Sequence, residues 1–185
     1  MKGEEYKSVE ESKAFFASAI KLIMDGKEKS FITLFEDFTG SYKEFSSDAI
    51  IKEFKSEGKT LVHIASASGK ENILKYILEK CDSALDVVNA SDLNGYTPLM
   101  NATNSGNVET IRLLLLYGAE VNKRNSNGAS CVHFAAGDGS TDILSLFFDN
   151  GVDIALIGES GSPLHWAAAK GHFKALEYVF LILNP

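Results

Sequence analysis

Residues 95–102 read GYTPLMNA, and related strings begin at residues 58, 128 and 160. The four strings end at Ala65, Ala102, Ala135 and Ala167, which follow one another at 37, 33 and 32 residues. A glycine stands four positions after each of these alanines. A period of about 33 residues indicates one small structural unit repeated along the chain. Such units must stack, because one unit alone cannot bury both sides of its helices.

The second unit shows how each repeat folds. Thr97 can cap a helix that begins at Pro98 and covers residues 98–104, since proline is tolerated in the first turn. A second helix is predicted over residues 108–117, where apolar residues recur at helical spacing. Gly118 then ends this helix in the left-handed conformation. Each unit is therefore predicted to be a pair of short antiparallel helices.

Asn-Gly pairs at residues 94–95 and 127–128 stand between the units. Asn-Gly is a strong signal for a tight two-residue hairpin turn. The fold class that follows is all-α, a solenoid of helix-turn-helix units with projecting β-hairpin loops.

The repeated strings resemble the ankyrin repeat. Residues 162–167 read SPLHWA and are similar to the Thr-Pro-Leu-His-x-Ala motif of that family. The resemblance covers about residues 55–185, with units at approximately 55–91, 92–124, 125–156 and 157–185. The chain departs from the motif at Met100 in place of histidine, and at Leu61 and Cys131 in place of proline. The first unit also has about four additional residues near residues 83–88.

Residues 1–54 lack the repeat motif but have helical patterns. A Ser8 to Glu11 capping box predicts a helix of roughly 9–25. Phe31, Leu34, Phe35 and Phe38 lie on one face of a second helix that Gly40 ends, and a third helix starts at Ser47. We interpret this region as a helical N-terminal cap on the solenoid; a small separate domain is the alternative.

The C-terminal helix, predicted over about residues 173–183, contains the apolar run YVFLIL and is followed by no polar cap. Its outer side would leave apolar surface in water. One expectation is that the native chain continues past Pro185 and that this is a fragment of a longer protein. The other is self-association in a homodimer through the C-terminal helix.

Composition excludes several classes of function. The chain has 18 Lys and Arg against 25 Asp and Glu, with a formal net charge of −7, so we expect neither nucleic acid nor an anionic membrane as a partner. No signal peptide and no apolar run long enough to span a bilayer is present in the sequence. Cys81 and Cys131 are too few and too far apart for a zinc site. A cytoplasmic or nuclear location is predicted.

The histidines and cysteines, which could act in catalysis or metal binding, have structural interpretations in this sequence. His63, His133 and His165 occupy the same position of their units, which points to a repeated architectural role. Cys131 and His133 are two residues apart at a helix start, a spacing that does not aim one at the other. No coherent set of nucleophile, base and oxyanion donors exists, so we predict no enzyme, no catalytic residues, no metal and no cofactor.

The resemblance implies a protein-interaction module that binds another protein, of unknown identity, through hairpin tips and inner helices. The variable positions that it places there include Leu93, Asn94, Tyr96, Asn104, Ser126, Asn127, Asp138 and Lys170. Among these, Tyr96 and Leu93 are the expected anchors, because large apolar side chains supply most binding energy. The alternative function is a targeting or scaffold fragment of a longer protein whose activity lies C-terminal to Pro185.

The resemblance also implies one modification site. In ankyrin repeats an asparagine that follows an acidic residue and valine, with a leucine eight positions before it, can be hydroxylated. Leu114, Glu120, Val121 and Asn122 fit this pattern. The other interpretation is that Asn122 stabilises the base of its hairpin.

Overall fold

The computed structural model describes residues 2–42, 46–53, 55–155, 157–158 and 161–183, with side chains from residue 10 onward. These residues form helices and connecting loops. The helices are α1 (Lys2–Met24), α2 (Glu28–Ser41), α3 (Ser47–Glu53), α4 (Leu61–Ala67), α5 (Glu71–Glu79), α6 (Ala84–Val88), α7 (Pro98–Asn104), α8 (Val108–Leu116), α9 (Cys131–Gly137), α10 (Thr141–Asp149), α11 (Pro163–Lys170) and α12 (Phe173–Leu183).

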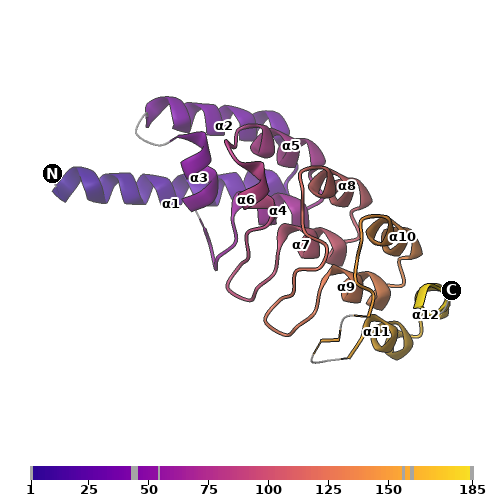
Figure 1. Ribbon diagram of the computed structural model, residues 1–185. Coiled ribbons are helices and arrows are strands. Elements are labelled where there is room, and N and C mark those ends of the chain that lie inside the picture. The colour runs from indigo at the N-terminus through magenta and orange to yellow at the C-terminus, as the bar shows by residue number, and fades with distance from the viewer. Residues whose placement is uncertain (1, 43–45, 54, 156, 159–160, 184–185) are drawn as a thin grey trace.

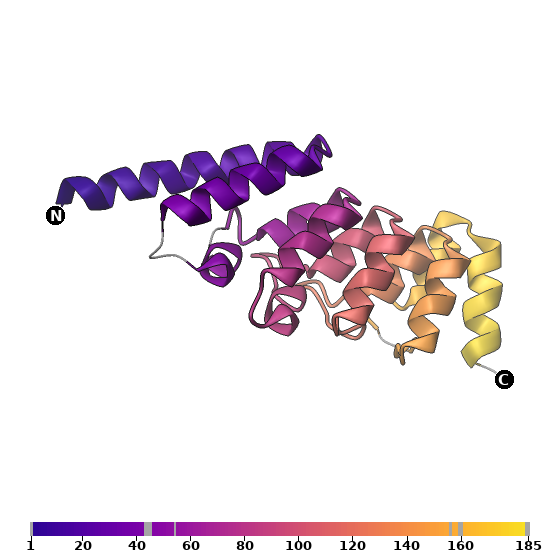
Figure 2. The ribbon, with the colours of Figure 1, turned by 90° about the horizontal axis from the view of Figure 1, so that it is seen from above.

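Two layers of helices form an elongated array (Figure 1). The inner helices α4, α7, α9 and α11 pack one against the next, and each is followed in the chain by an outer helix, α5, α8, α10 or α12. Figure 2 shows these pairs side by side from α4 and α5 to α11 and α12, with the first two helices at the opposite end from the C-terminus. The predicted solenoid of helix pairs is confirmed.

The inner helices begin as the sequence predicts. The side chain of Thr97 accepts a hydrogen bond from the amide of Met100, and Pro98 occupies the first turn of α7. In the other three units the capping residue, Thr60, Ser130 or Ser162, forms a reciprocal capping box with a histidine three positions later. This arrangement satisfies amides that have no partner within the helix itself.

The outer helix of the second unit also matches its prediction closely. It covers Val108–Leu116 and ends before Gly118, which has φ of +86°. The additional residues of the first unit form the short helix α6, whose Val87 and Val88 are buried. The insertion therefore adds to the core instead of bulging from it.

The loops between units are closed by turns, and no β-strand occurs in the described residues. At residues 92–95 the amide of Gly95 donates to the carbonyl of Asp92 at 3.0 Å, and Gly95 has φ of +77° while Asn94 does not have positive φ. The predicted two-residue turn at Asn94-Gly95 needs positive φ at both residues, so that detail was wrong. The turn instead spans three residues with only its glycine left-handed.

A true two-residue turn occurs in the first loop. Ser56 and Lys59 exchange both backbone hydrogen bonds, at 3.0 and 2.8 Å, around Glu57 and Gly58. Both central residues have positive φ, +54° and +77°. Glu57 is the one described residue other than glycine with positive φ, a conformation that costs roughly 1–2 kcal/mol for a residue with a Cβ atom.

The N-terminal region continues the two layers. Helix α1 packs against α2 and α4, and α2 packs against α5. Phe31 and Phe35 meet the ring of Tyr76 edge-on at 6.2 and 5.9 Å between ring centroids. The pair α1 and α2 therefore packs on the first repeat, and its assignment as a cap stays a prediction.

Two boundaries in this region differ from the prediction. Helix α1 begins at Lys2, so Ser8 lies inside it and not at its start; residues 2–8 contain no proline, and Gly3 lies in the first turn. Helix α2 continues through Gly40 to Ser41, and the amide of Tyr42 closes it on the carbonyl of Phe38 at 3.0 Å.

Among the described helices, none is both long and apolar enough to cross a membrane.

Candidate protein-binding surface

The loop of residues 92–96 is held by one buried carboxylate. Oδ1 of Asp92 accepts hydrogen bonds from the amides of Asn94 and Tyr96, both at 2.9 Å. The backbone closes the same loop through the amide of Asp92, which donates to the carbonyl of Tyr96 at 2.9 Å. The loop therefore has its own internal scaffold and presents a fixed backbone.

The next loop repeats this device with an amide side chain. Oδ1 of Asn125 accepts from the amides of Asn127 and Ala129 at 3.1 and 2.9 Å. Asp92 and Asn125 are both buried, and each precedes an Asn-Gly pair by two positions. Sequence reasoning missed this role, although an Asp or Asn before the turn is a recognisable Asx-turn signal.

Successive loops are tied to one another. The amide of Leu93 donates to the carbonyl of Glu57 at 3.4 Å, and the amide of Ser126 donates to the carbonyl of Asn94 at 3.0 Å. The close approach of these two loop backbones requires glycine at position 95, because a Cβ atom there would lie 2.8 Å from the amide nitrogen of Ser126. The loops consequently form a continuous row and not a set of independent arms (Figure 1).

The structure brings four of the predicted residues together at the tips of this row. Leu93, Asn94, Ser126 and Asn127 are exposed there, on two loops that are hydrogen-bonded to each other. Leu93 is an apolar side chain with 77% of its surface in solvent. We call these four residues the tip cluster. It has no charged side chain, so it offers one apolar contact surrounded by neutral hydrogen-bonding groups.

Tyr96, the other expected anchor, is half-buried. Its ring packs on Phe134 at 5.6 Å between centroids, and Phe134 in turn meets Trp166 edge-on at 5.5 Å. Trp166 also contacts the ring of His133 at 5.6 Å. These aromatic residues connect three successive units, so Tyr96 has a packing role in addition to whatever surface it offers a partner.

Three predicted residues lie apart from the tip cluster. Asn104, Asp138 and Lys170 are exposed at the C-terminal ends of α7, α9 and α11. An inner helix of seven residues is about 10 Å long, so these ends are separated from the loop tips by at least that distance. A partner that contacts the tip cluster and also these three residues must extend along the inner helices.

One of the repeated histidines, His63, joins its unit to the next. Nδ1 of His63 accepts from the amide of Thr60 at 3.2 Å, so the proton lies on Nε2, which donates to the carbonyl of Tyr96 in the next unit at 3.1 Å. Burial lowers the pKa of His63 below its ordinary value, which keeps the ring neutral. This neutral form is the one that both hydrogen bonds require.

The cysteines are free and shielded thiols. Sγ of Cys131 donates to the carbonyl of Val121 at 3.0 Å, and burial raises the pKa of this thiol. Nδ1 of His133 is occupied by the amide of Ser130 at 3.1 Å, so it does not act as a base toward Cys131. Burial raises the pKa of Cys81 to about 12. Neither thiol is activated as a nucleophile.

Asn122 bridges two units with its side chain. Its Nδ2 donates to the carbonyl of Gly151 at 3.1 Å, and its Oδ1 accepts from the amide of Asp153 at 2.8 Å. Asn89 makes the same pair of bonds one unit earlier, to Gly118 at 2.9 Å and Glu120 at 2.9 Å. Asn122 thus ties its unit to the next one instead of bonding within its own hairpin, and its hydroxylation stays a prediction. No group of residues suited to a metal ion occurs among the described side chains.

Comparison with known proteins agrees with this geometry. The family model for ankyrin repeats (3 copies) matches residues 37–125 and 114–183. The first match begins within the region that the sequence analysis assigned to the cap, and the boundary at residue 54 remains a prediction.

Relatives with diverse names contain similar stretches. The chain is 28% identical over 136 residues to transient receptor potential cation channel subfamily A member 1 of Homo sapiens, covering 73% of this chain and 12% of that protein. It is 31% identical over 100 residues to the B-cell lymphoma 3 protein homolog of Mus musculus, covering 54% and 22%. It is 24% identical over 135 residues to the probable 26S proteasome regulatory subunit p28 of Saccharomyces cerevisiae, covering 71% and 59%.

The chain thus spans less than two thirds of each of these relatives. What is common to them and to this chain is the repeated helix pair. The family match extends over most of the chain, and the four helix pairs with their linked loops have the architecture that the repeats predict. The chain therefore belongs to the ankyrin-repeat family.

Proposed function

We propose that this protein is a non-catalytic interaction module that binds a partner protein along its row of loops and inner helices. Ankyrin repeats are in general protein-interaction modules, and the names of the relatives include a cation channel and a proteasome regulatory subunit. The proposal gives the tip cluster the central contact and gives Asn104, Asp138 and Lys170 the outlying ones.

The observation that supports this proposal most directly is the set of hydrogen bonds that hold the loop row around an exposed leucine. Binding costs free energy when flexible segments must be ordered, so a loop that is already held by Asp92 or Asn125 loses little on binding. A large apolar side chain inside a neutral polar rim is a typical centre for a protein interface. The partner segment it suits is uncharged, with an apolar residue that packs on Leu93.

A binding experiment tests the proposal. The full chain is immobilised and exposed to cell lysate beside the Leu93→Asp variant, with Leu116→Asp as the matched control. Leu116 is an equally exposed leucine, at 81%, but it lies on the outer helix α8. We expect Leu93→Asp to lose a captured partner and Leu116→Asp to keep it. If both variants capture the partner equally well, the tip cluster is not part of the interface.

We place this interaction in the cytoplasm or nucleus. The two free thiols support that placement, because reducing compartments keep cysteines in this state.

A further inference from the structure

The chain contains three Asn-Gly pairs, at residues 94–95, 127–128 and 150–151. An asparagine followed by glycine is prone to deamidation without any enzyme, because glycine has no side chain to shield its backbone nitrogen from the neighbouring carboxamide. The first two pairs lie on the row of loops that projects from the array (Figure 1), and the third lies at the end of α10. One chemistry is therefore present in two structural settings.

Deamidation requires that the glycine nitrogen reach Cγ, the carbonyl carbon of the asparagine side chain. The nitrogen forms a bond to Cγ, the bond from Cγ to Nδ2 breaks, and ammonia leaves with the proton that the glycine nitrogen gives up. Water then hydrolyses the five-membered cyclic imide. Opening at the side-chain carbonyl yields aspartate, and opening at the backbone carbonyl yields isoaspartate. The reaction therefore needs a free carboxamide and a free glycine nitrogen.

The carboxamides of the two loop asparagines are available for this attack. Asn94 and Asn127 are exposed, and no other described residue makes a hydrogen bond to either carboxamide. The carboxamide of Asn150 is held instead, since its Nδ2 donates to the carbonyl of Leu146 at 2.8 Å. The requirement on the side chain is therefore met in the loops and not at the end of α10.

The attacking nitrogen is occupied while each loop is closed. The amide of Gly95 donates to the carbonyl of Asp92 at 3.0 Å, and the amide of Gly128 donates to the carbonyl of Asn125 at 2.9 Å. The bonds to Oδ1 of Asp92 and of Asn125 hold the same loops. Each glycine nitrogen must leave its carbonyl before it reaches Cγ, so deamidation needs a local opening of the loop. Exposed loops open at a lower free energy than packed elements do.

We propose that Asn94 and Asn127 deamidate spontaneously in the folded chain, at a rate set by the opening of their loops, and that Asn150 is protected. In the loops one opening is sufficient, because the carboxamides are already free. At Asn150 two bonds must break, the one to Leu146 and the one from the amide of Gly151 to the carbonyl of Phe148 at 3.0 Å. The tips of the row are thus self-modifying sites.

Deamidation changes the tip cluster in two ways. A carboxylate replaces a neutral carboxamide in a cluster that has no charged side chain. Isoaspartate at position 94 also moves out of the main chain the carbonyl that accepts from the amide of Ser126. Under the proposed function, an uncharged partner segment then binds less tightly, and this consequence rests on that proposal. The deamidation itself involves only this chain and water, so its test is independent of any partner.

The test follows deamidation of the full chain by peptide mapping with mass spectrometry. The chain is incubated at mildly alkaline pH in heavy-oxygen water, which marks the hydrolysis that occurs before digestion. The chain in concentrated urea is the reference, because the three pairs are then free of their structural settings. We expect rates at the three sites within threefold of one another in urea. In the folded chain all three should be slower, with Asn94 and Asn127 at least tenfold faster than Asn150.

Two variants at position 92 test the role of the loop. Asp92→Ala removes the acceptor and should raise the rate at Asn94 at least threefold, while Asn127 in the same molecule stays within twofold and reports any general loosening of the fold. Asp92→Asn keeps the acceptor and should leave both rates within twofold of the wild type. The proposal is overturned if Asn94 and Asn127 react as slowly as Asn150 in the folded chain, or as fast as in urea. Asp92→Ala overturns it too if it accelerates both loop sites equally or neither of them.

Discussion

At the scale of single residues, His63, one of the histidines that recur in the repeats, connects its unit to the next. His63 accepts a hydrogen bond within its own helix start and donates one to the following unit. Both bonds depend on the neutral ring with its proton on Nε2. The sequence could predict that these histidines are structural, since they recur at one position, but it could not show which nitrogen serves which unit.

His63→Gln removes this junction, and we expect it to lower the free energy of unfolding by about 1–3 kcal/mol, because buried polar groups lose their partners. The loss should shrink as the pH falls. The pKa of His63 is lower in the folded state than its ordinary value of 6.5 in the unfolded chain. Below pH 6.5 the unfolded state therefore binds more protons than the folded state. The stability that the neutral ring supplies is lost as the pH falls through this range.

Urea unfolding of the wild type and of His63→Gln at neutral and at mildly acidic pH measures this effect. Other titrating groups are common to both proteins, so the difference between the two unfolding free energies isolates His63. A difference that stays constant with pH would show that the ring does not depend on its neutral form.

Glu57 offers a second residue-scale prediction. It occupies the left-handed region in a two-residue turn, which asparagine tolerates far better than glutamate. Its side chain is exposed, while its carbonyl accepts from Leu93. Glu57→Asn should therefore raise the free energy of unfolding by about 0.5–1 kcal/mol. Chemical denaturation checks this, and a lower stability for the variant would contradict the turn geometry.

At the scale of elements, the row of loops depends on one acceptor in each loop. Asp92 and Asn125 perform the same task with different side chains, since each uses only its Oδ1 atom. The chemical requirement is therefore an oxygen at this position and not a negative charge.

We accordingly expect Asp92→Ala to lower the free energy of unfolding by about 1–3 kcal/mol and to increase hydrogen exchange at the amides of Asn94 and Tyr96. Asp92→Asn is the matched control and should leave the free energy of unfolding and the hydrogen exchange of these amides within error of the wild type. Equal effects of the two variants would mean that charge, and not the acceptor geometry, holds the loop.

Elements with strong local signals were predictable. The helices at 98–104 and 108–116 follow from capping residues, proline, apolar spacing and glycine, all of which act within one unit. The start of α1 at Lys2 was missed because Ser8 and Glu11 imitate a capping box inside a sequence that can continue as a helix in both directions. The turn at residues 92–95 was misassigned because the Asx bonds from Asp92 change its geometry.

At the scale of the whole molecule, the period of the repeats predicted the stack and its order, since each unit can bury its core only against its neighbours. What the period could not show is which variable residues meet. Leu93, Asn94, Ser126 and Asn127 come together because the amide of Ser126 reaches the carbonyl of Asn94. Tyr96 instead packs its ring on Phe134 of the next unit. No pattern within one unit indicates this contact between units.

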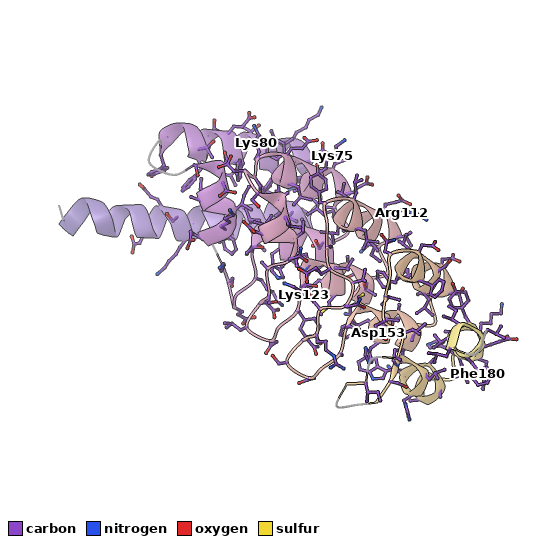
Figure 3. The ribbon with its side chains drawn as sticks, in the orientation of Figure 1. Lys75, Lys80, Arg112, Lys123, Asp153 and Phe180 are labelled. Atoms are coloured by element: carbon purple, nitrogen blue, oxygen red, sulfur yellow. The ribbon has the colours of Figure 1, made fainter. Side chains whose placement is uncertain are left out.

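In our proposal the row of loops, and not the outer helices, receives the partner. The most direct measurement replaces Leu93 by a photoreactive amino acid and compares it with the same replacement at Lys75. Lys75 is exposed on the outer helix α5 and is labelled in Figure 3. We expect irradiation in lysate to cross-link one distinct protein at position 93 and not at position 75. Cross-linking of that protein at position 75 alone would place the partner on the outer helices and contradict the proposed interface.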